Sequence, residues 1–352
     1  MTFKEKRKIL QINNSIENAI ISIFTKNEKL ANKSIKTLKK IFKFTNNNSL
    51  ITWLDGCNKL AQNKNHEAKA IFYSGTYSSS PILSGYSLYK LCDSEKNNNE
   101  SYNTLLYLKD KCGIENLPKE SIYDLIKYQL LNKKFEQARE TIKYLKNNRL
   151  LGISYFLENK DNITCLEYAY KYAKEIPNIS LFYADKIYFL NSSQKSKRRI
   201  LLKSWKINHL PEIFDAIMDT VEKDKQINFA KSIIEESSFE GLFKLAELLY
   251  NNEIYAMSLN YFRKAFSVYP SEECANKIIN IENLLNKHSF DVSSLHLSQN
   301  PRWICSQCGN NAETWHAFCP ICNSLDSIKW TKSCEMKNNN KTQNKLLSIE
   351  KY

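Results

Sequence analysis

The sequence predicts an all-α protein, a solenoid of short helices that ends in a small cysteine-rich module. Only seven of its 352 residues are Gly and seven are Pro, whereas an average chain of this length carries about 25 Gly. Sheet proteins and nucleotide-binding folds need Gly at their turns and where the backbone approaches phosphate. Apolar residues recur at three- and four-residue intervals from about residue 15 to residue 286, which is the period of amphipathic helices.

Asn clusters and single Pro residues divide this apolar pattern into seventeen predicted helices. Short helices joined by loops of a few residues pack as antiparallel pairs, so a solenoid is more economical than one large bundle. The predicted helices cover 15–26, 28–43, 49–63, 66–74, 81–93, 99–111, 119–132, 134–147, 149–159, 161–175, 178–191, 195–207, 211–222, 224–235, 239–251, 253–268 and 271–287.

The clearest repeat unit runs from Leu242 to Pro270. Small residues at Ala246 and Ser258 let two antiparallel helices approach closely, and Phe262 fills the space between this pair and the next. With Ala265 one turn further on, the spacing resembles the tetratricopeptide repeat. The alternative is ordinary helical hairpins without true repeats. The same steps recur at Gly56, Ala68, Phe72 and Gly75, at Ala138, Ile142 and Leu145, and at Cys165, Ala169 and Tyr172 with Pro177 in the closing position.

A tetratricopeptide-like array predicts a binding function. Each unit contacts only its neighbours, and the stack curves into a groove that holds peptides or helices of partner proteins. We therefore expect a non-enzymatic adaptor or scaffold with a protein partner in that groove. The sequence lacks the GxSxG, GxxxxGK[ST] and HExxH motifs of common enzyme classes. Single cysteines along the array are expected to be small core residues, namely Cys57, Cys92, Cys112, Cys165 and Cys274.

The C-terminal module carries the one strong chemical signal in the sequence. Four cysteines fall within 18 residues as two CxxC pairs, Cys305 with Cys308 and Cys319 with Cys322. Two such pairs predict a tetrahedral four-sulfur metal site in a zinc ribbon or rubredoxin-like module. Softness and geometry favour Zn²⁺ as a structural ion, with a single iron as the alternative. Because the segment is too small to fold on its own core, metal binding is expected to supply its folding energy.

Residues around the cysteines refine this prediction. Gly309 follows the first pair and Asn323 the second, and both residue types tolerate the left-handed conformation that such knuckles require. His316 is expected to be a surface residue and Cys334 to lie in the polar tail, neither of them a ligand. Two disulfides are improbable in a reducing compartment, and a redox-active dithiol needs only one CxxC. Three Trp residues frame the module and are expected to form its core or a face that docks on a partner or on the last helices: Trp303, Trp315 and Trp330.

The net charge of +14 is concentrated at the start of the chain, where residues 1–43 hold eleven Lys and Arg against three Glu. A solvated helix pair or a peripheral contact with an anionic membrane would account for this. No segment has the roughly 20 apolar residues that a spanning helix needs. Ten cysteines without a signal peptide indicate a reducing, cytoplasm-like compartment.

These observations divide the chain into five expected parts. They are a basic helical N-terminal segment at 1–48, the repeat array at 49–287, a linker at 288–302, the four-cysteine zinc ribbon at 303–330 and a polar disordered tail at 331–352.

The combination of array and ribbon resembles the HemY-type tetratricopeptide-repeat proteins of alphaproteobacteria, best over about 195–330. A more distant resemblance is to the LapB-type adaptor, which is tethered to the membrane and ends in a rubredoxin-like knuckle pair. The first resemblance implies a link to haem biosynthesis and a cytoplasmic array at the inner face of the cytoplasmic membrane, although the sequence predicts no N-terminal transmembrane anchor. The resemblance to HemY-type proteins rests on Asn300-Pro301-Arg302-Trp303, Asp326 to Trp330, Ser204-Trp205-Lys206, Pro211-Glu212-Ile213, Glu272 to Asn286, Trp53 to Gly56 and Glu67-Ala68.

Two other functions compete with the adaptor. A single iron in the four-sulfur site would make the protein a rubredoxin-like electron carrier or a metal sensor. Nucleic-acid binding is disfavoured, because Lys329 is the one basic residue of the ribbon and is opposed by Glu313 and Asp326.

Overall fold

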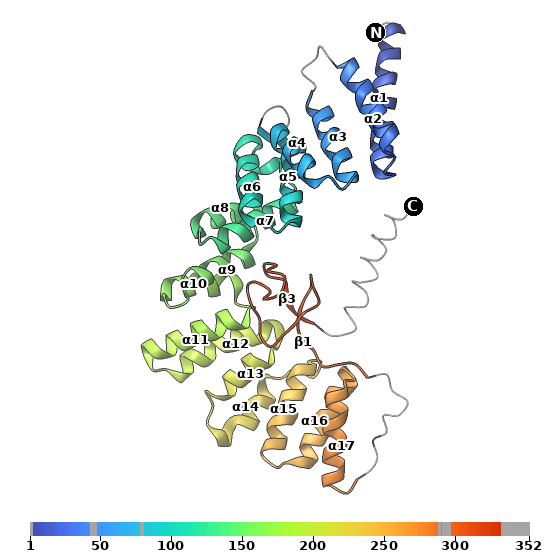
Figure 1. Ribbon diagram of the computed structural model, residues 1–352. Coiled ribbons are helices and arrows are strands. Elements are labelled where there is room, and N and C mark those ends of the chain that lie inside the picture. The colour runs from blue at the N-terminus through green and yellow to red at the C-terminus, as the bar shows by residue number, and fades with distance from the viewer. Residues whose placement is uncertain (1–2, 43–47, 78–80, 288–289, 291–296, 332–352) are drawn as a thin grey trace. The chain divides into compact units, whose positions relative to one another are not determined.

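The computed structural model describes residues 3–42, 48–77, 81–287, 290 and 297–331, and most of this part of the chain is helical (Figure 1). It forms two compact units, Met1–Lys134 and Phe135–Tyr352. The described residues contain seventeen α-helices, the number that the sequence predicts. None of these helices combines the length and apolarity that a bilayer crossing requires.

The first unit is built from helix hairpins that are adjacent in sequence. Helix α1 packs with α2, α3 with α4 and α5 with α6. The helices are α1 (Phe3–Phe24), α2 (Glu28–Ile41), α3 (Asn48–Ala61), α4 (Asn65–Tyr77), α5 (Pro81–Ser94), α6 (Asn98–Cys112), the 3-10 turn η1 (Ile114–Asn116) and α7 (Lys119–Leu131).

The second unit continues the same construction and adds a small sheet. Helix α9 packs with α10, α11 with α12 and α15 with α16. Its elements are α8 (Phe135–Leu145), α9 (Asn148–Glu158), α10 (Ile163–Ala173), α11 (Pro177–Asn191), α12 (Gln194–Asn208), α13 (Pro211–Met218), the 3-10 turn η2 (Lys223–Lys225), α14 (Gln226–Ile233), α15 (Phe239–Asn251), α16 (Tyr255–Val268), α17 (Glu272–Leu284), β1 (Arg302–Cys305), β2 (Asn311–Ala312) and β3 (Ile328–Thr331). The all-α, tetratricopeptide-like fold class is confirmed.

Two predicted helix boundaries are wrong. Helix α1 begins at Phe3, twelve residues before the expected start. The prediction missed this first part of the helix because it has no buried apolar face: Ile9 and Leu10 are both exposed. Helix α13 ends at Met218, four residues early. The Gln226 side chain donates to the Met218 carbonyl at 2.9 Å and so replaces the partner that a longer helix would have supplied.

A left-handed residue follows the first helix in several of the hairpins, whereas the turn between α9 and α10 has none, and Lys146, Ser192 and His209 adopt this conformation at other spacings. Lys26, Asn63, Lys96 and Lys133 all have positive φ, between 53° and 59°, and they follow one another at intervals of 37, 33 and 37 residues. At the third turn, the N–H of Asn97 donates to the Cys92 carbonyl at 2.8 Å, the bond that closes a Schellman motif. In the second unit Glu253 and Asn286 have the same conformation 33 residues apart. This recurrence favours true repeats over unrelated hairpins. At these turns Lys, Asn and Glu occupy the left-handed position that is usually taken by Gly.

Replacing Lys96 with Gly is expected to raise the free energy of unfolding by about 0.5–1 kcal/mol. The left-handed conformation strains a side chain with a Cβ but not Gly, and this gain exceeds the extra entropy of Gly in the unfolded chain. Urea unfolding measures the change. Lys90→Gly, an exposed position inside α5, is the control and should lower stability by about 1 kcal/mol. A loss of stability in Lys96→Gly would contradict the prediction.

The predicted repeat contacts are present in the hairpin of α15 and α16. Ala246, Ser258, Phe262 and Ala265 are all fully buried. The Ser258 hydroxyl donates to the Ala246 carbonyl at 2.8 Å. The small side chain therefore allows the two helices to approach closely and stabilises that approach with a hydrogen bond. In the first unit, the Phe72 ring occupies the space that a Cβ on Gly56 would need. The second set of predicted positions therefore packs in the same manner.

One predicted set is out of register. On α10, Ala169 is buried as expected, but Cys165 and Tyr172 are only half-buried and Ala173 is fully buried. The reason lies on α9, where Gly152 faces α10 so closely that a Cβ would come within 2.9 Å of the Ala169 carbonyl oxygen. This contact turns α10 so that Ala173 faces the interface.

The array cysteines are less uniformly buried than expected. Cys92 and Cys274 are core residues, whereas Cys57, Cys112 and Cys165 are half-buried. Burial raises the pKa of Cys274 to about 12 and that of Cys57 to about 11. Both thiols are therefore protonated at neutral pH and unreactive.

Candidate metal centre

The C-terminal module is a three-stranded antiparallel sheet that carries two loops. The strand order is β2-β1-β3, with Trp303 on β1 opposite Trp330 on β3. The first CxxC pair begins at Cys305, the last residue of β1, and continues into the loop before β2, where Cys308 lies, whereas the second pair lies in the segment between β2 and β3. The sheet holds the two loops on one small framework.

The two loops are copies of the same knuckle. In the first, the N–H of Gly309 donates to the Cys305 carbonyl at 2.9 Å, and φ of Gly309 is +73°. In the second, the N–H of Asn323 donates to the Cys319 carbonyl at 2.9 Å, and φ of Asn323 is 54°. The left-handed conformation predicted for both residues is confirmed. Each turn brings its two cysteine side chains to the same side of the loop.

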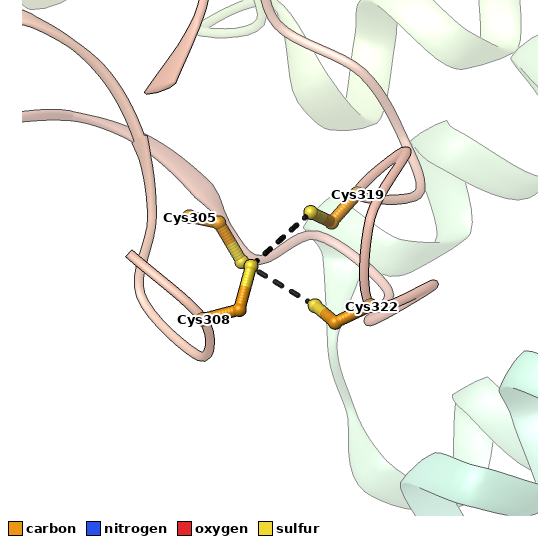
Figure 2. Close-up of side chains that lie close together, drawn as sticks. All are labelled: Cys305, Cys308, Cys319 and Cys322. Carbon is orange, nitrogen blue, oxygen red and sulfur yellow. Dashed lines mark hydrogen bonds between the residues drawn. The ribbon is translucent and has the colours of Figure 1, made fainter. Parts of the chain in front are cut away.

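The four sulfur atoms converge on one point, as Figure 2 shows. Cys305 Sγ lies 3.6 Å from Cys322 Sγ, Cys308 Sγ lies 3.7 Å from Cys319 Sγ, and all four atoms lie within 4.8 Å of one another. A tetrahedral zinc site with Zn–S bonds of about 2.3 Å has S–S edges of about 3.8 Å. The four predicted ligands therefore form a set that could bind a metal ion.

Hydrogen bonds around the sulfurs favour two of the thiolates. Burial acts to raise the pKa of Cys305, but the Ser327 hydroxyl and backbone N–H groups outweigh it and lower the pKa to about 6. At Cys322 burial is likewise outweighed, by the hydroxyl and N–H of Ser324, and the pKa is lowered. A backbone N–H acts to lower the pKa of Cys308, yet hydrogen bonding with the other three thiols raises it to about 12. Thiolates are the metal-binding form of cysteine, so the knuckles prepare this site for a cation.

The other candidate ligands named from the sequence do not join the cluster. His316 is exposed and is not part of the sulfur group. Cys334 lies outside the described residues. With four protein sulfurs around one point, a bound ion would have no open position for water or substrate, which is typical of structural rather than catalytic sites.

Two of the Trp residues dock the module onto helices of the second unit. The indole N–H of Trp303 donates to Glu212 on α13 at 2.7 Å, and that of Trp330 donates to Glu240 on α15 at 3.1 Å. The two rings meet edge to face, with centroids 5.4 Å apart. Trp315 is 2% exposed and belongs to the core of the ribbon. Of the roles predicted for the Trp residues, contact with the helices falls to Trp303 and Trp330 and burial in the module to Trp315, whereas docking on a partner stays a prediction.

An ion-pair network makes a third contact between ribbon and helices. Arg149 on α9 binds Asp326 through two nitrogens, Nε to Oδ2 at 2.7 Å and Nη2 to Oδ1 at 3.0 Å. Its third nitrogen contacts Glu175 at 3.0 Å, and Lys329 lies 3.0 Å from Asp326. Burial, together with the charge of Arg149, lowers the pKa of Lys329 and outweighs the attraction of Asp326. Sequence reasoning missed Arg149, because 177 positions separate it from its partner and no local pattern links them.

The ribbon is thus seated on α9, α13 and α15 (Figure 1). The segment that leads into the ribbon is also fixed, since Ser298 pairs with Ser271 at the start of α17. A bidentate Arg–carboxylate pair and two indole donors, from the buried Trp303 and the half-buried Trp330, are specific contacts. The ribbon and the second unit therefore form one structural whole.

No protein-family model and no curated protein sequence matches this chain. Among solved structures, PilF of Pseudomonas aeruginosa is 12% identical over 79% of this chain and 99% of that chain, with a TM-score of 0.30. A tetratricopeptide repeat protein from Parabacteroides merdae is 12% identical over 78% of this chain and all of that chain (100%), with a TM-score of 0.31. Naa15/Naa10 bound to HypK-THB is 13% identical over 79% of this chain, which spans 39% of that chain, with a TM-score of 0.32.

TM-scores of 0.30 to 0.32 are too low to support an inference about this chain. The repeats are therefore assigned from the turns and helix contacts of the chain itself. The resemblance to HemY-type and LapB-type proteins stays a prediction.

Proposed function

We propose that this protein is a non-enzymatic scaffold that binds a partner protein and uses a structural Zn²⁺ to hold its C-terminal ribbon. The observation that carries this proposal is the closed set of four sulfurs in a module that is itself fastened to the helices by Arg149 and two Trp residues. Cys305, Cys308, Cys319 and Cys322 would bind the ion. A closed tetrahedron supplies stability rather than Lewis-acid chemistry, because no ligand position is left for a substrate.

The helical repeats supply the binding surface in this proposal. Hairpins of 33 to 37 residues present the side chains of successive helices side by side, which suits extended contact with another protein. Because the ribbon covers parts of α9, α13 and α15, a partner in the second unit would bind beside the ribbon or to another face.

Elemental analysis and crosslinking together test the scaffold. Purified full-length protein should contain one zinc per chain and be colourless, and crosslinking in cells should recover a defined partner protein. A red protein whose visible bands bleach with dithionite would replace the proposal with one-iron electron transfer. Recovery of no protein partner would reject the scaffold even if zinc is present.

We also propose a cytoplasmic location at the inner face of the membrane, with partners in haem biosynthesis. The support is the basic character of residues 1–43 and the resemblance to HemY-type proteins. Anionic phospholipid vesicles should sediment the protein at low salt and release it as salt screens the charges. Equal sedimentation with neutral vesicles would contradict a charge-driven contact.

A further inference from the structure

Four exposed cations form a stripe along helix α12. Lys195, Arg199, Lys203 and Lys206 follow one another at steps of four, four and three residues and are all exposed. At 3.6 residues per turn these steps keep the four side chains within about 80° of the helix circumference, over a length of about 16 Å. We call this set the α12 stripe. In the described part of the chain, none of the four forms an ion pair.

The remaining charges of α12 are already engaged, and the helix has no acidic residue of its own. Lys197 pairs with Asp185 at 2.6 Å. Arg198 donates from Nε to the Thr220 hydroxyl at 2.9 Å and from Nη2 to the Thr220 carbonyl. The α12 stripe therefore consists of the cations that the fold leaves unused, on the side of the helix opposite its buried residues.

The stripe also borders a hollow with an apolar floor. The hollow has a volume of about 450 Å³ and is lined by Lys195, Arg198, Arg199, Leu202, Lys203 and Lys206. Leu202 is half-buried and lies within the stripe. Together with the methylene stems of the neighbouring Lys and Arg residues it offers apolar surface between the charges.

We propose that the α12 stripe binds an acidic amphipathic segment of a partner protein. On a helix of the partner, Glu or Asp residues four apart are separated by about 6 Å along the axis, the same step as the cations of α12. An apolar side chain between them would fill the hollow over Leu202. Opposite charges across such a surface guide association and fix register. This inference rests on the proposed scaffold and names the chemistry of its partner.

The surface suits a protein better than a nucleic acid. Trp205 is the sole aromatic residue of α12 and is 1% exposed, so the stripe has no ring on which a base could stack. Arg198 is held by Thr220, which leaves Arg199 as the one arginine of the stripe free for a bidentate phosphate contact. Lysine ammonium groups around an apolar floor match carboxylates on an amphipathic helix.

A second basic stripe provides a matched control. Lys29, Lys33, Lys36 and Lys40 on α2 are also exposed and similarly spaced along one face. The residues beside them are the polar Asn32 and Thr37, and the exposed Leu30 lies about 60° further round the helix. Charge reversal at two positions of either stripe changes the net charge of the protein by the same amount. Any effect of net charge alone would therefore appear in both variants.

The test is fluorescence anisotropy with the full-length protein and a labelled helical peptide of about 20 residues with Glu at every fourth position and Leu between. Arg199→Glu with Lys203→Glu should weaken binding at least tenfold, because two attractive pairs become repulsive. Lys33→Glu with Lys36→Glu should change it less than about twofold. Circular dichroism of both variants checks that the helices remain folded.

Several results would overturn the proposal. They are no binding of the peptide by the wild-type protein, equal losses in the two variants, or tighter and stripe-dependent binding of a uridine oligonucleotide. If the peptide fails to bind but crosslinking still recovers a partner, the scaffold stands and the α12 stripe is not its docking site. If the peptide binds through the stripe and crosslinking recovers no protein, the scaffold fails while the stripe remains an acidic-peptide site.

Discussion

Replacing Cys305 and Cys319 with Ser is expected to abolish metal binding and to unfold the ribbon while leaving the helical repeats folded. One sulfur is lost from each knuckle, and Ser does not replace thiolate as a zinc ligand. Structural zinc sites contribute roughly 10–16 kcal/mol of apparent binding free energy, and a module of this size has no comparable core to replace it. The metal content of the purified protein should fall from one ion per chain to none.

Limited proteolysis gives a second measurement of the same change. The wild-type protein should resist cleavage across residues 302–331, whereas the double variant should be cut there first and keep nearly all of its helical circular dichroism. Cys112→Ser, at a half-buried array cysteine outside the sulfur cluster, is the control and should retain both the metal and the protection. Full metal content in the double variant would contradict the assignment of these cysteines as metal ligands.

Replacing Arg149 with Met is expected to loosen the ribbon from α9 and to lower the free energy of unfolding by about 2–3 kcal/mol. Breaking a fully buried ion pair costs about 3–5 kcal/mol because one charge is left unpaired. Here the cost is smaller, since Lys329 still contacts Asp326 and the Arg149 side chain is 28% exposed. Hydrogen exchange should accelerate at the amide of Asp326, which donates to the Ala317 carbonyl at 2.7 Å.

A second arginine of the same unit separates docking from general stability. Arg139 binds Glu158 through two nitrogens at 2.7 and 3.4 Å, and within the described residues no hydrogen bond or ion pair joins it to the ribbon. Arg139→Met should therefore lower the stability of the helices without changing exchange at Asp326 or the rate at which a chelator removes the metal. If both variants accelerate ribbon exchange equally, Arg149 does not serve as a specific fastening of the ribbon.

The repeats could be predicted because their signals are local. The packing of Ala246 against Ser258 depends on residues within one hairpin, and the apolar period within one helix sets most helix ends to within a few residues. The exceptions have non-local causes. Helix α13 stops where Gln226 takes its carbonyl, and α10 is turned by the close approach of Gly152 on the neighbouring helix. Neither contact has a sequence pattern that could have indicated it.

The metal site was predictable for the same reason that the repeats were. Both CxxC pairs, Gly309 and Asn323 are spaced within single turns, so backbone geometry alone brings each pair of sulfurs together. What the sequence could not supply was the place of the ribbon in the molecule. The contacts of Trp303 with Glu212 and of Trp330 with Glu240 span 91 and 90 residues, and single residues separated so far leave no periodic trace.

The scarcity of Gly illustrates how the two levels divide. Composition alone argued against a fold built mainly from sheet and against nucleotide-binding loops, and it favoured helices, because a chain with seven Gly cannot form many tight turns in which only Gly is tolerated. The tertiary structure then decided that Lys, Asn and Glu occupy the left-handed turns between helices. It also decided which of the many surface cations are paired and which stay unused on α12. Helix formation and knuckle geometry follow from neighbouring residues, whereas ion pairing and docking depend on which distant surfaces the folded chain brings together.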